Sequence, residues 1–157
     1  MKQDNHITQE LLCNLFDYED GRLRWKKTQK IAGCVRNDGR RVVGIKGKLY
    51  LSYRLIWMIH HGSLPDLIDH IDGNPSNDRI ENLRPATKTQ NGQNRNGPKK
   101  NAKTGFMGVY FDKCRNLYAS EIIVNGQKIH LGRHKTPEEA HEAYLAAKRQ
   151  FHEFNTL

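Results

Sequence analysis

The sequence has few cysteines, no long apolar run and, over one long stretch, almost no acidic residues. Its three cysteines, Cys13, Cys34 and Cys114, are odd in number and far apart, which excludes a paired-cysteine zinc site and indicates reduced thiols in a cytoplasm. No segment approaches the roughly 20 apolar residues that a membrane span needs. The first residues, MKQDNHITQELL, lack the basic start and apolar core of a secretion signal. We therefore expect an intracellular protein that is neither secreted nor bound to a membrane.

Acidic residues are almost absent between Arg22 and Lys48. This stretch holds ten Lys or Arg residues and one acid, Asp38, and so accounts for the net charge of +9 in a chain with 26 Lys and Arg against 17 Asp and Glu. A clustered charge flanked by aromatic residues is typical of a surface that follows a phosphate backbone, and a merely soluble basic protein is the alternative. No amphipathic helix carries the charge, which favours nucleic acid over a membrane surface. The residues expected to contact the DNA backbone are Arg36, Arg40, Arg41 and Lys46.

The periodicity of the first half predicts small α+β modules rather than one large core, in keeping with 157 residues of which 36% are hydrophobic. A short helix is expected over residues 8–16, with Thr8 as its cap. Short β-like runs separated by glycines predict an antiparallel meander over residues 23–51. Ser52 is expected to cap a second helix over residues 53–61.

The second half opens with a polar stretch rich in Gly, Pro and Lys, residues 95–103, which predicts a basic linker. Three strand-like runs follow, at residues 108–111, 117–124 and 127–131. The last two are joined by Asn125-Gly126, a strong signal for a two-residue hairpin. Thr136, Pro137 and Glu139 then mark the start of a helix through a capping box. This half therefore predicts a β-β-β-α unit.

Acidic, imidazole and amide side chains crowd together in DHIDGNPSNDRIENLRPATKTQNGQN, residues 69–94. Asp69 and His70 end a short strand before a turn-rich loop, and Thr87 is the expected cap of a helix with Asn91 in its first turn. Because the strand end and the helix start can face each other, we expect the oxygens of Asp69 and Asn91 to converge. Such oxygens suit a magnesium ion that keeps water and phosphate in its other positions, and His70 could deprotonate a water. The pattern is typical of phosphodiester hydrolysis.

Asp69-His70, Asn82 and Asn91 in this run resemble the HNH endonuclease family with its ββα-metal fold. The resemblance covers roughly residues 49–94, and the basic meander before it looks like the lead-in of phage and intron-encoded members. It implies that His70 is the general base, that Asp69 and Asn91 bind the metal, and that Asn82 holds the loop and orients the His. It also implies a cytoplasmic enzyme of a bacterium or a phage-infected cell.

The last letter of the motif is Asn rather than His. Members that end in His bind softer transition metals well, whereas the oxygen donors Asp69 and Asn91 favour magnesium, with manganese possible. A calcium-binding EF-hand that starts at Asp69 is excluded, because one ligand position falls on Ile71 and Gly73 stands one place too early. An Asn-rich turn with one surface His is the plain alternative. We expect no organic cofactor.

The segment from Thr104 to about Phe154 is similar to the AP2 domain, a three-stranded sheet backed by one helix. The similarity lies in Gly108-Val109, Tyr118-Ala119, Ile129-His130-Leu131-Gly132 and the helix from Thr136. In that family the sheet face opposite the helix lies in the DNA major groove. Strand alternation puts Ile129 and Leu131 under the helix and Lys128 and His130 on the other face. The DNA-facing residues expected are Tyr110, Lys113, Arg115, Tyr118, Lys128 and His130.

The resulting organisation is an HNH nuclease domain over residues 1–94, a linker over 95–103 and an AP2-like domain over 104–157. Within the first domain, residues 22–48 are the basic lead-in and residues 64–94 are about the extent of the ββα-metal core. The function expected is metal-dependent cleavage of double-stranded DNA by a homing-type phage or mobile-element endonuclease. The enzyme would act as a monomer or a homodimer and would nick one strand or break both. The alternative is a DNA-binding regulator with a weak HNH site, and an RNA-directed nuclease is disfavoured because stacking signatures for RNA are absent.

Overall fold

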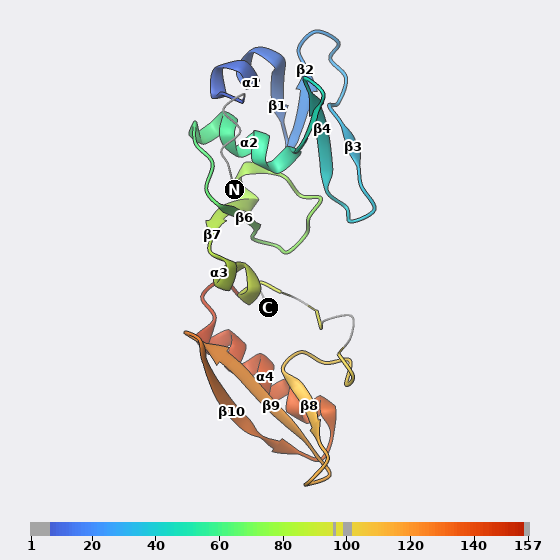
Figure 1. The fold of residues 1–157 in the computed structure, drawn as a ribbon, viewed down its shortest axis with the longest axis vertical. Coiled ribbons are helices and arrows are strands. Elements are labelled where there is room, and N and C mark those ends of the chain that lie inside the picture. Colours follow the sequence, from blue (N-terminus) through green and yellow to red (C-terminus); the bar gives the residue numbers. More distant parts are fainter. Residues whose placement is uncertain (1–6, 96, 99–101, 156–157) are drawn as a thin grey trace. The chain divides into compact units, whose positions relative to one another are not determined.

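The computed structural model describes residues 7–95, 97–98 and 102–155 and contains both helices and strands, so the α+β class is confirmed (Figure 1). The chain forms two compact units, Met1–Lys88 (unit 1) and Thr89–Leu157 (unit 2), and α3 (Lys88–Gln93) lies at the division. Among the described residues, no helix has both the length and the apolar character that crossing a membrane requires. The expected domain boundaries at residues 94 and 104 stay a prediction.

Unit 1 begins with α1 (Gln9–Leu15), whose start is fixed by the expected cap. The Thr8 hydroxyl accepts a hydrogen bond from the Leu11 N–H at 3.2 Å. Phe16, expected as the last helical residue, instead has extended backbone and opens β1 (Phe16–Glu19). The helix is therefore one residue shorter than the sequence indicates, and an additional strand follows it.

Five strands, β1 to β5, lie between residues 16 and 51, and they form two sheets. β1 pairs antiparallel with β2 (Arg22–Trp25) through a turn at Asp20-Gly21. β3 (Cys34–Val35), β4 (Arg41–Ile45) and β5 (Lys48–Leu51) form a second antiparallel sheet in that order. The antiparallel meander is confirmed for these three strands, whereas Leu23 belongs to the hairpin of β1 and β2.

α2 (Ser52–His61) follows β5 without a connecting turn. Leu51, the last strand residue, occupies the cap position, and the Ser52 hydroxyl is buried without a hydrogen-bond partner among the described residues. The expectation that Ser52 caps this helix is therefore wrong, because the chain passes directly from strand to helix and Ser52 is already helical. The helix ends where sequence indicates, at Gly62, whose φ is 72°.

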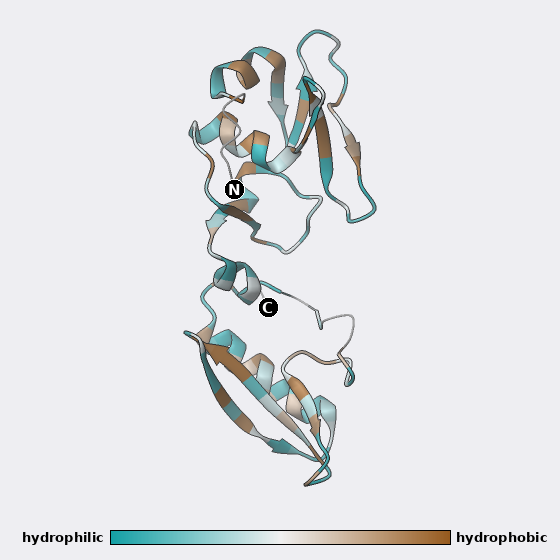
Figure 2. Cartoon of the chain, viewed as in Figure 1, coloured by the Kyte–Doolittle hydropathy of each residue, from teal (hydrophilic) through white to brown (hydrophobic). Residues whose placement is uncertain are grey.

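The core of unit 1 joins these elements to the final strand pair. β6 (Leu67–His70) and β7 (Leu83–Ala86) pair antiparallel, with the short 3₁₀ turn Ile80–Asn82 just before β7. Figure 2 shows apolar residues on α1, α2 and the adjoining strands of this unit. The fully or nearly fully buried members of the core include Leu12, Phe16, Leu23, Val43, Ile56, Ile68 and Leu83. β6, which carries Asp69 and His70, is thus anchored in the main core.

Unit 2 has the expected β-β-β-α order. β8 (Val109–Asp112), β9 (Leu117–Val124) and β10 (Gln127–His134) form an antiparallel sheet with β9 in the centre. Asn125 and Gly126 both have positive φ, as the predicted two-residue hairpin requires. α4 (Pro137–Phe151) begins at the expected cap, because the Thr136 hydroxyl accepts from the Glu139 N–H at 3.3 Å.

α4 packs on one face of this sheet (Figure 1). On β9, Ile122 is 2% exposed and its neighbour Ile123 is 55% exposed, so the face that carries Ile122 is the covered one. Gly108 lies so close to α4 that a Cβ atom there would stand 2.0 Å from the Tyr144 ring. Glycine is therefore required at residue 108 for the helix to approach the sheet.

The predicted linker is tied to α4 at its first residue. The Lys148 ammonium is buried and donates a hydrogen bond of 2.5 Å to the Arg95 carbonyl oxygen. Burial holds the pKa of Lys148 below its ordinary value. Residues 96 and 99–101 of the predicted linker lie outside the described residues.

Candidate active site

Asp69 and His70 occupy the end of β6, as the sequence indicates. Both side chains are buried, with 5% and 8% of their surfaces exposed. Across the strand pair, Asp69 lies opposite Arg84 and His70 lies opposite Leu83. Successive strand residues point to opposite faces, so the two side chains enter different surroundings.

The His70 ring is held by two groups that sequence reasoning missed. Its Nε2 lies 2.9 Å from Oδ1 of Asp78, a carboxylate that is itself 4% exposed. The buried Tyr53 of α2 contacts the ring edge to face at 5.1 Å between centroids. In the neutral ring, a hydrogen bond donated by Nε2 to this carboxylate assigns the proton to Nε2 and the lone pair to Nδ1.

Asn82 ties down the loop between β6 and the 3₁₀ turn. Its amide oxygen accepts from the Asp72 N–H at 3.0 Å, and its amide nitrogen donates to Asp72 Oδ1 at 2.9 Å and to the Asn77 carbonyl at 2.8 Å. Asp78 follows Asn77 directly, so Asn82 supports the segment from which Asp78 reaches His70. These contacts agree with the loop-holding role expected of Asn82, and its effect on His70 stays a prediction.

Asp72 is the centre of the loop's hydrogen bonds. Its carboxylate accepts from the Asn77 side chain at 2.7 Å and from the Asn74 N–H at 2.8 Å, in addition to Asn82. Partial burial by itself would raise the pKa of Asp72, but these hydrogen bonds outweigh it and hold the pKa below its ordinary value. The charged carboxylate is therefore the form that the loop requires.

The Asp69 carboxylate forms an ion pair across the strands. Arg84 donates to Asp69 Oδ2 from Nε at 3.1 Å and from a terminal nitrogen at 2.9 Å. A carboxylate offers about four lone-pair positions, so an ion pair at Oδ2 is compatible with coordination of a cation. The donor chemistry at Asp69 fits an oxygen-preferring divalent ion.

The earlier strands of unit 1 support the same loop. The Tyr18 hydroxyl of β1 accepts from the Ile80 N–H at 3.0 Å, and the Ser76 hydroxyl donates to the Gly39 carbonyl at 2.7 Å. At Gly21, whose φ is 78°, a Cβ atom would lie 2.8 Å from the Arg79 backbone nitrogen. The hairpin of β1 and β2 and the turn before β4 therefore buttress the segment that carries Asp78.

Asn91, the second expected metal ligand, lies in α3 and is exposed. Thr87 directly precedes this helix, in the position expected of its cap. Asn91 belongs to unit 2, whereas Asp69 and His70 belong to unit 1, so the convergence of Asp69 and Asn91 stays a prediction. Among the residues that the structure describes, no three His, Cys, Asp or Glu side chains gather as a metal site.

The four residues expected to grip the DNA backbone are not one contiguous set. Arg36 and Arg40 lie in the turn before β4 and are exposed. Nε of Arg36 lies 3.9 Å from Oδ1 of Asp38, at the limit of an ion pair. Arg41, at the start of β4, donates to the carbonyls of residues 32 and 33 and is half-buried. Lys46 stands in the turn after β4, at the opposite end of that strand. Arg41 therefore has a structural contact in addition to its charge.

The sheet of unit 2 separates two tyrosines that were expected on one face. Tyr110 lies opposite Ala119, and Tyr118 lies opposite Phe111, whose ring it contacts at 5.0 Å. Since Tyr118 and Ile122 are four residues apart on β9, Tyr118 shares the face that α4 covers. The register of β8 and β9 therefore puts the two tyrosines on opposite faces of the sheet, and the expected DNA contact of Tyr118 stays a prediction.

The other expected residues of unit 2 lie away from α4. Lys128 and His130 pair with Ile123 and Glu121, on the exposed face, and Lys128 forms an ion pair with Glu121 at 3.0 Å. Ile129 shares the face of buried Ile122, as expected, although it remains 37% exposed. Leu131 lies at a register shift between His130 and Gly132.

Lys113 and Arg115 stand in the exposed turn between β8 and β9. Arg115 and Arg133 both donate to Oδ2 of Asp112, at 3.3 and 3.2 Å. Burial alone would raise the pKa of Asp112, but the two arginines hold it below its ordinary value. The Arg115 charge is thus shared with an acid of the same turn.

One segment of the chain matches a known protein family, and two viral proteins are similar to the chain. Residues 50–93 match the model of the family described as HNH endonuclease. Protein 3.8 of Escherichia phage T7 is 36% identical over 75 residues, which are 46% of this chain and 61% of that protein. Uncharacterized HNH endonuclease L560 of Acanthamoeba polyphaga mimivirus is 29% identical over 134 residues, 83% of this chain and 68% of that protein. No solved structure matches the chain significantly.

The matched segment and the mimivirus relative carry the same description, HNH endonuclease. The chain spans 61% of the length of the phage relative, so these similarities bear on a shared segment and not on the whole of that protein. The resemblance of residues 104–154 to the AP2 domain stays a prediction.

Proposed function

We propose that the protein is a metal-dependent DNA endonuclease of the phage or mobile-element homing type. The observation that carries this proposal is the buried pair of His70 and Asp78, 2.9 Å apart, beside Asp69 within the HNH segment. A His fixed by a carboxylate and placed next to a candidate metal ligand is suited to activate water for phosphodiester hydrolysis.

In this mechanism His70 is the general base. With Nε2 held by Asp78, its Nδ1 accepts the proton of a water as that water attacks the scissile phosphorus. Asp78 is a positioning residue that fixes the tautomer and orientation of the ring. Asn82 keeps the loop closed beneath both residues through its bonds to Asp72 and Asn77.

Asp69 and Asn91 are the residues that would hold the divalent cation. Carboxylate and amide oxygens favour magnesium, with manganese as the substitute. The bound cation would supply charge stabilisation to the transition state and to the departing 3′ oxygen. Arg84 orients the Asp69 carboxylate across the strand pair.

The remaining basic surfaces would position double-stranded DNA. Arg36, Arg40, Arg41 and Lys46 supply sequence-independent contacts to phosphates. In unit 2, the sheet face opposite α4, with Tyr110, Lys128 and His130, would enter the major groove as in AP2 domains. Lys113 and Arg115 would then touch flanking phosphates.

A plasmid relaxation assay tests the proposal, since one gel separates supercoiled, nicked and linear DNA. Wild type is expected to cleave with magnesium and not with EDTA, and His70→Ala to lose about 10² to 10⁴ in rate. His61→Ala is the matched control, because His61 ends α2 and stacks on Trp57 at 4.0 Å. Equal cleavage by wild type and His70→Ala would contradict the mechanism, whereas a nicked or a linear product would indicate one or two active sites per event.

A DNA-binding regulator is the second candidate, and the ion pair of Asp69 with Arg84 favours it. A carboxylate that is 5% exposed and already paired with an arginine binds a cation less readily than an unpaired one. Firm DNA binding without cleavage, under every divalent ion tried, would support this function and contradict the nuclease.

A further inference from the structure

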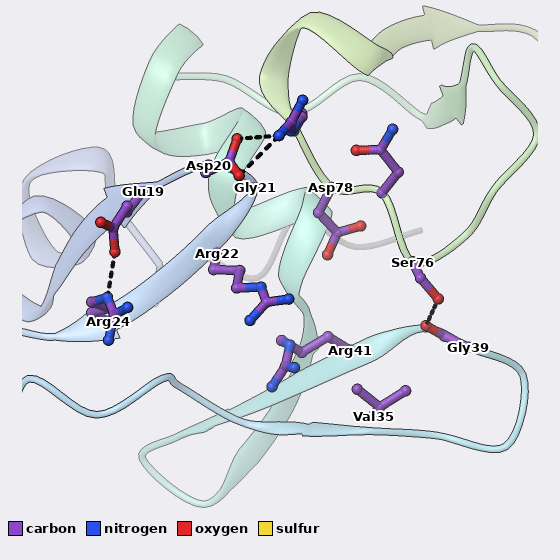
Figure 3. Close-up of a pocket in the computed structure, with 12 residues that line it drawn as sticks. Glu19, Asp20, Gly21, Arg22, Arg24, Val35, Gly39, Arg41, Ser76 and Asp78 are labelled. Carbon is purple, nitrogen blue, oxygen red and sulfur yellow. Dashed lines mark hydrogen bonds and ion pairs between the residues drawn. The ribbon is translucent and has the colours of Figure 1, made fainter.

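A pocket of about 740 Å³ lies in unit 1 beside the candidate active site (Figure 3). Its walls come from three separate segments: the hairpin of β1 and β2, the strands β3 and β4 with their connecting turn, and residues 76–79 of the loop. Four arginines line it, namely Arg22, Arg24, Arg41 and Arg79. Because these three segments are far apart in sequence, the pocket exists only when unit 1 is folded.

Two of these arginines are neutralised by acids of the pocket rim. Arg24 pairs with Glu19 at 2.5 Å, and Arg79 pairs with Asp20 at 2.7 Å. The hydrogen bond that Arg79 donates to Asp20 is also the largest cause that raises the pKa of Arg79 above its ordinary value. The Arg79 guanidinium thus holds the hairpin turn against the loop, whereas the pair of Arg24 and Glu19 lies within the hairpin.

Arg22 and Arg41 have no such partner. Within the described residues, no carboxylate pairs with either guanidinium, and the polar contacts of Arg41 are with backbone carbonyls. Figure 3 shows both side chains pointing into the same space from β2 and β4, with Asp78 on the facing wall. Two uncompensated positive groups directed into one pocket create a position suited to an anion.

The same pocket reaches the candidate catalytic pair. Asp78 is one of its lining residues, and Asp78 Oδ1 is the atom that holds His70 Nε2. An anion held by Arg22 and Arg41 would therefore lie on the Asp78 side of the general base. A DNA strand that places its scissile phosphate at His70 carries its next phosphates at regular intervals along the backbone.

We propose that Arg22 and Arg41 form a subsite for a phosphodiester that flanks the scissile bond on the Asp78 side of His70. The subsite rests on the proposed nuclease function for its choice of DNA as the source of the phosphate. Arg22 would donate from an exposed guanidinium that has no acidic partner among the described residues, while Arg41 is pre-positioned by its bonds to the carbonyls of residues 32 and 33. Binding there fixes the register of the strand relative to the general base.

Binding by the full-length chain, in EDTA so that no cleavage occurs, tests the subsite. The ligand is a duplex selected from a random pool by wild type, and each phosphate in turn is replaced by an uncharged methylphosphonate. At one position near the cleaved bond, the replacement is expected to raise the Kd of wild type about tenfold, the loss of one charge-assisted contact. Arg22→Ala is expected to raise the Kd of the unmodified duplex by a similar factor and to be insensitive to that replacement.

Matched variants separate this coupling from a general loss of charge or of fold. Lys26→Ala removes one charge from unit 1 outside the pocket and is expected to keep the wild-type response to each methylphosphonate. Arg22→Lys, with an unchanged melting temperature, is expected to restore part of the coupling. If Arg22→Ala responds to every methylphosphonate as strongly as wild type does, the subsite is contradicted.

Two further arms identify what fails. Cleavage of the unmodified duplex by wild type in magnesium, without coupling at Arg22, would overturn the subsite and leave the nuclease intact. Coupling at Arg22 without any cleavage would overturn the nuclease alone. Exchange of chloride for inorganic phosphate at constant ionic strength is expected to leave the Kd unchanged, and a competitive rise that Arg22→Ala lacks would assign the pocket to free phosphate instead.

Discussion

At the scale of single residues, the contact of His70 with Asp78 determines which ring nitrogen can act. Asp78 carries no letter of the motif, and it reaches the ring only because the loop folds back over eight residues. In the proposed mechanism its side chain touches His70 and not the reacting atoms, so its effect on cleavage would pass through the orientation of the ring. Variants of Asp78 and of His70 should therefore differ in how strongly they lower the cleavage rate.

Asp78→Asn is expected to lower the cleavage rate constant by about 10- to 100-fold, the usual cost of losing a carboxylate behind a functional His. The amide can keep a hydrogen bond to the ring but no longer fixes the tautomer. Single-turnover kinetics and a binding isotherm check this, with an unchanged Kd expected. Asp78→Glu should recover part of the rate, and a loss confined to the Kd would contradict the positioning role.

The depressed pKa of Asp72 makes a pH prediction for the loop. Because the folded pKa lies below the ordinary value of 3.8, the charged carboxylate stabilises the fold above that value, and the contribution is lost as the pH falls through the folded pKa. Melting temperatures of wild type and Asp72→Asn should therefore differ at neutral pH and converge in acid. A difference that grows as the pH falls would contradict the sign.

Local patterns were sufficient for Asp69 and His70, since a strand end before a turn-rich loop is visible in the sequence. They were not sufficient for Asp78 or Arg84. Opposite charges on paired strands are a known stabilising combination, but the pairing of Asp69 with Arg84 depends on a register that the irregular loop between the strands sets. Contacts of this kind follow from loop geometry, which residue types alone do not specify.

At the scale of elements, the β-β-β-α unit could be predicted because its signals are local. The Asn125-Gly126 turn and the capping box at Thr136 both act within a few residues. The relative faces of Tyr110 and Tyr118 could not be predicted, because the alternation of side chains within one strand does not specify how that strand pairs with its neighbour. The cap expected at Ser52 was also wrong, because β5 passes directly into α2 and Leu51 occupies the cap position.

The two tyrosines give a paired prediction. Tyr110→Ala is expected to weaken DNA binding by about 5- to 150-fold, the effect of about 1–3 kcal/mol at a base-facing position, and to change the melting temperature little. Tyr118→Ala should instead lower the melting temperature through loss of its packing on Phe111. Fluorescence anisotropy and thermal melting of both variants check this. The reverse pattern would contradict the assignment of the exposed face to DNA.

At the scale of the whole molecule, the net charge of +9 and its concentration in residues 22–48 set the salt dependence of DNA binding. This property was accessible from sequence, because net charge does not depend on the fold. Which of these charges remain unpaired was not accessible from sequence, because the ion pairs of Arg24, Arg79 and Lys128 with acids depend on the fold. The unpaired cations are the ones expected to release counterions from DNA.

Neutralising Arg40 and Arg41 together is expected to weaken binding and to make the slope of log K against log salt shallower by about 1.8, or 0.9 for each phosphate contact. Titrations at several salt concentrations check this. Arg40→Ala alone is the control for folding, because Arg41 also holds the carbonyls of residues 32 and 33. An unchanged slope would remove both residues from the backbone contacts.

The support that Tyr18, Gly21 and Gly39 give to the loop has a consequence for inheritance of the activity. The family segment starts at residue 50, yet residues 18–39 hold the loop within it. The Tyr18 hydroxyl accepts a hydrogen bond from the loop backbone, Gly21 approaches that backbone closely, and the Gly39 carbonyl accepts from the serine of the loop. Recombination that exchanged only the family segment would carry the motif letters into a new host chain without their scaffold. The smallest portion of this gene that can be transplanted with its chemistry intact therefore begins well upstream of the motif, and lineages should retain the two parts together.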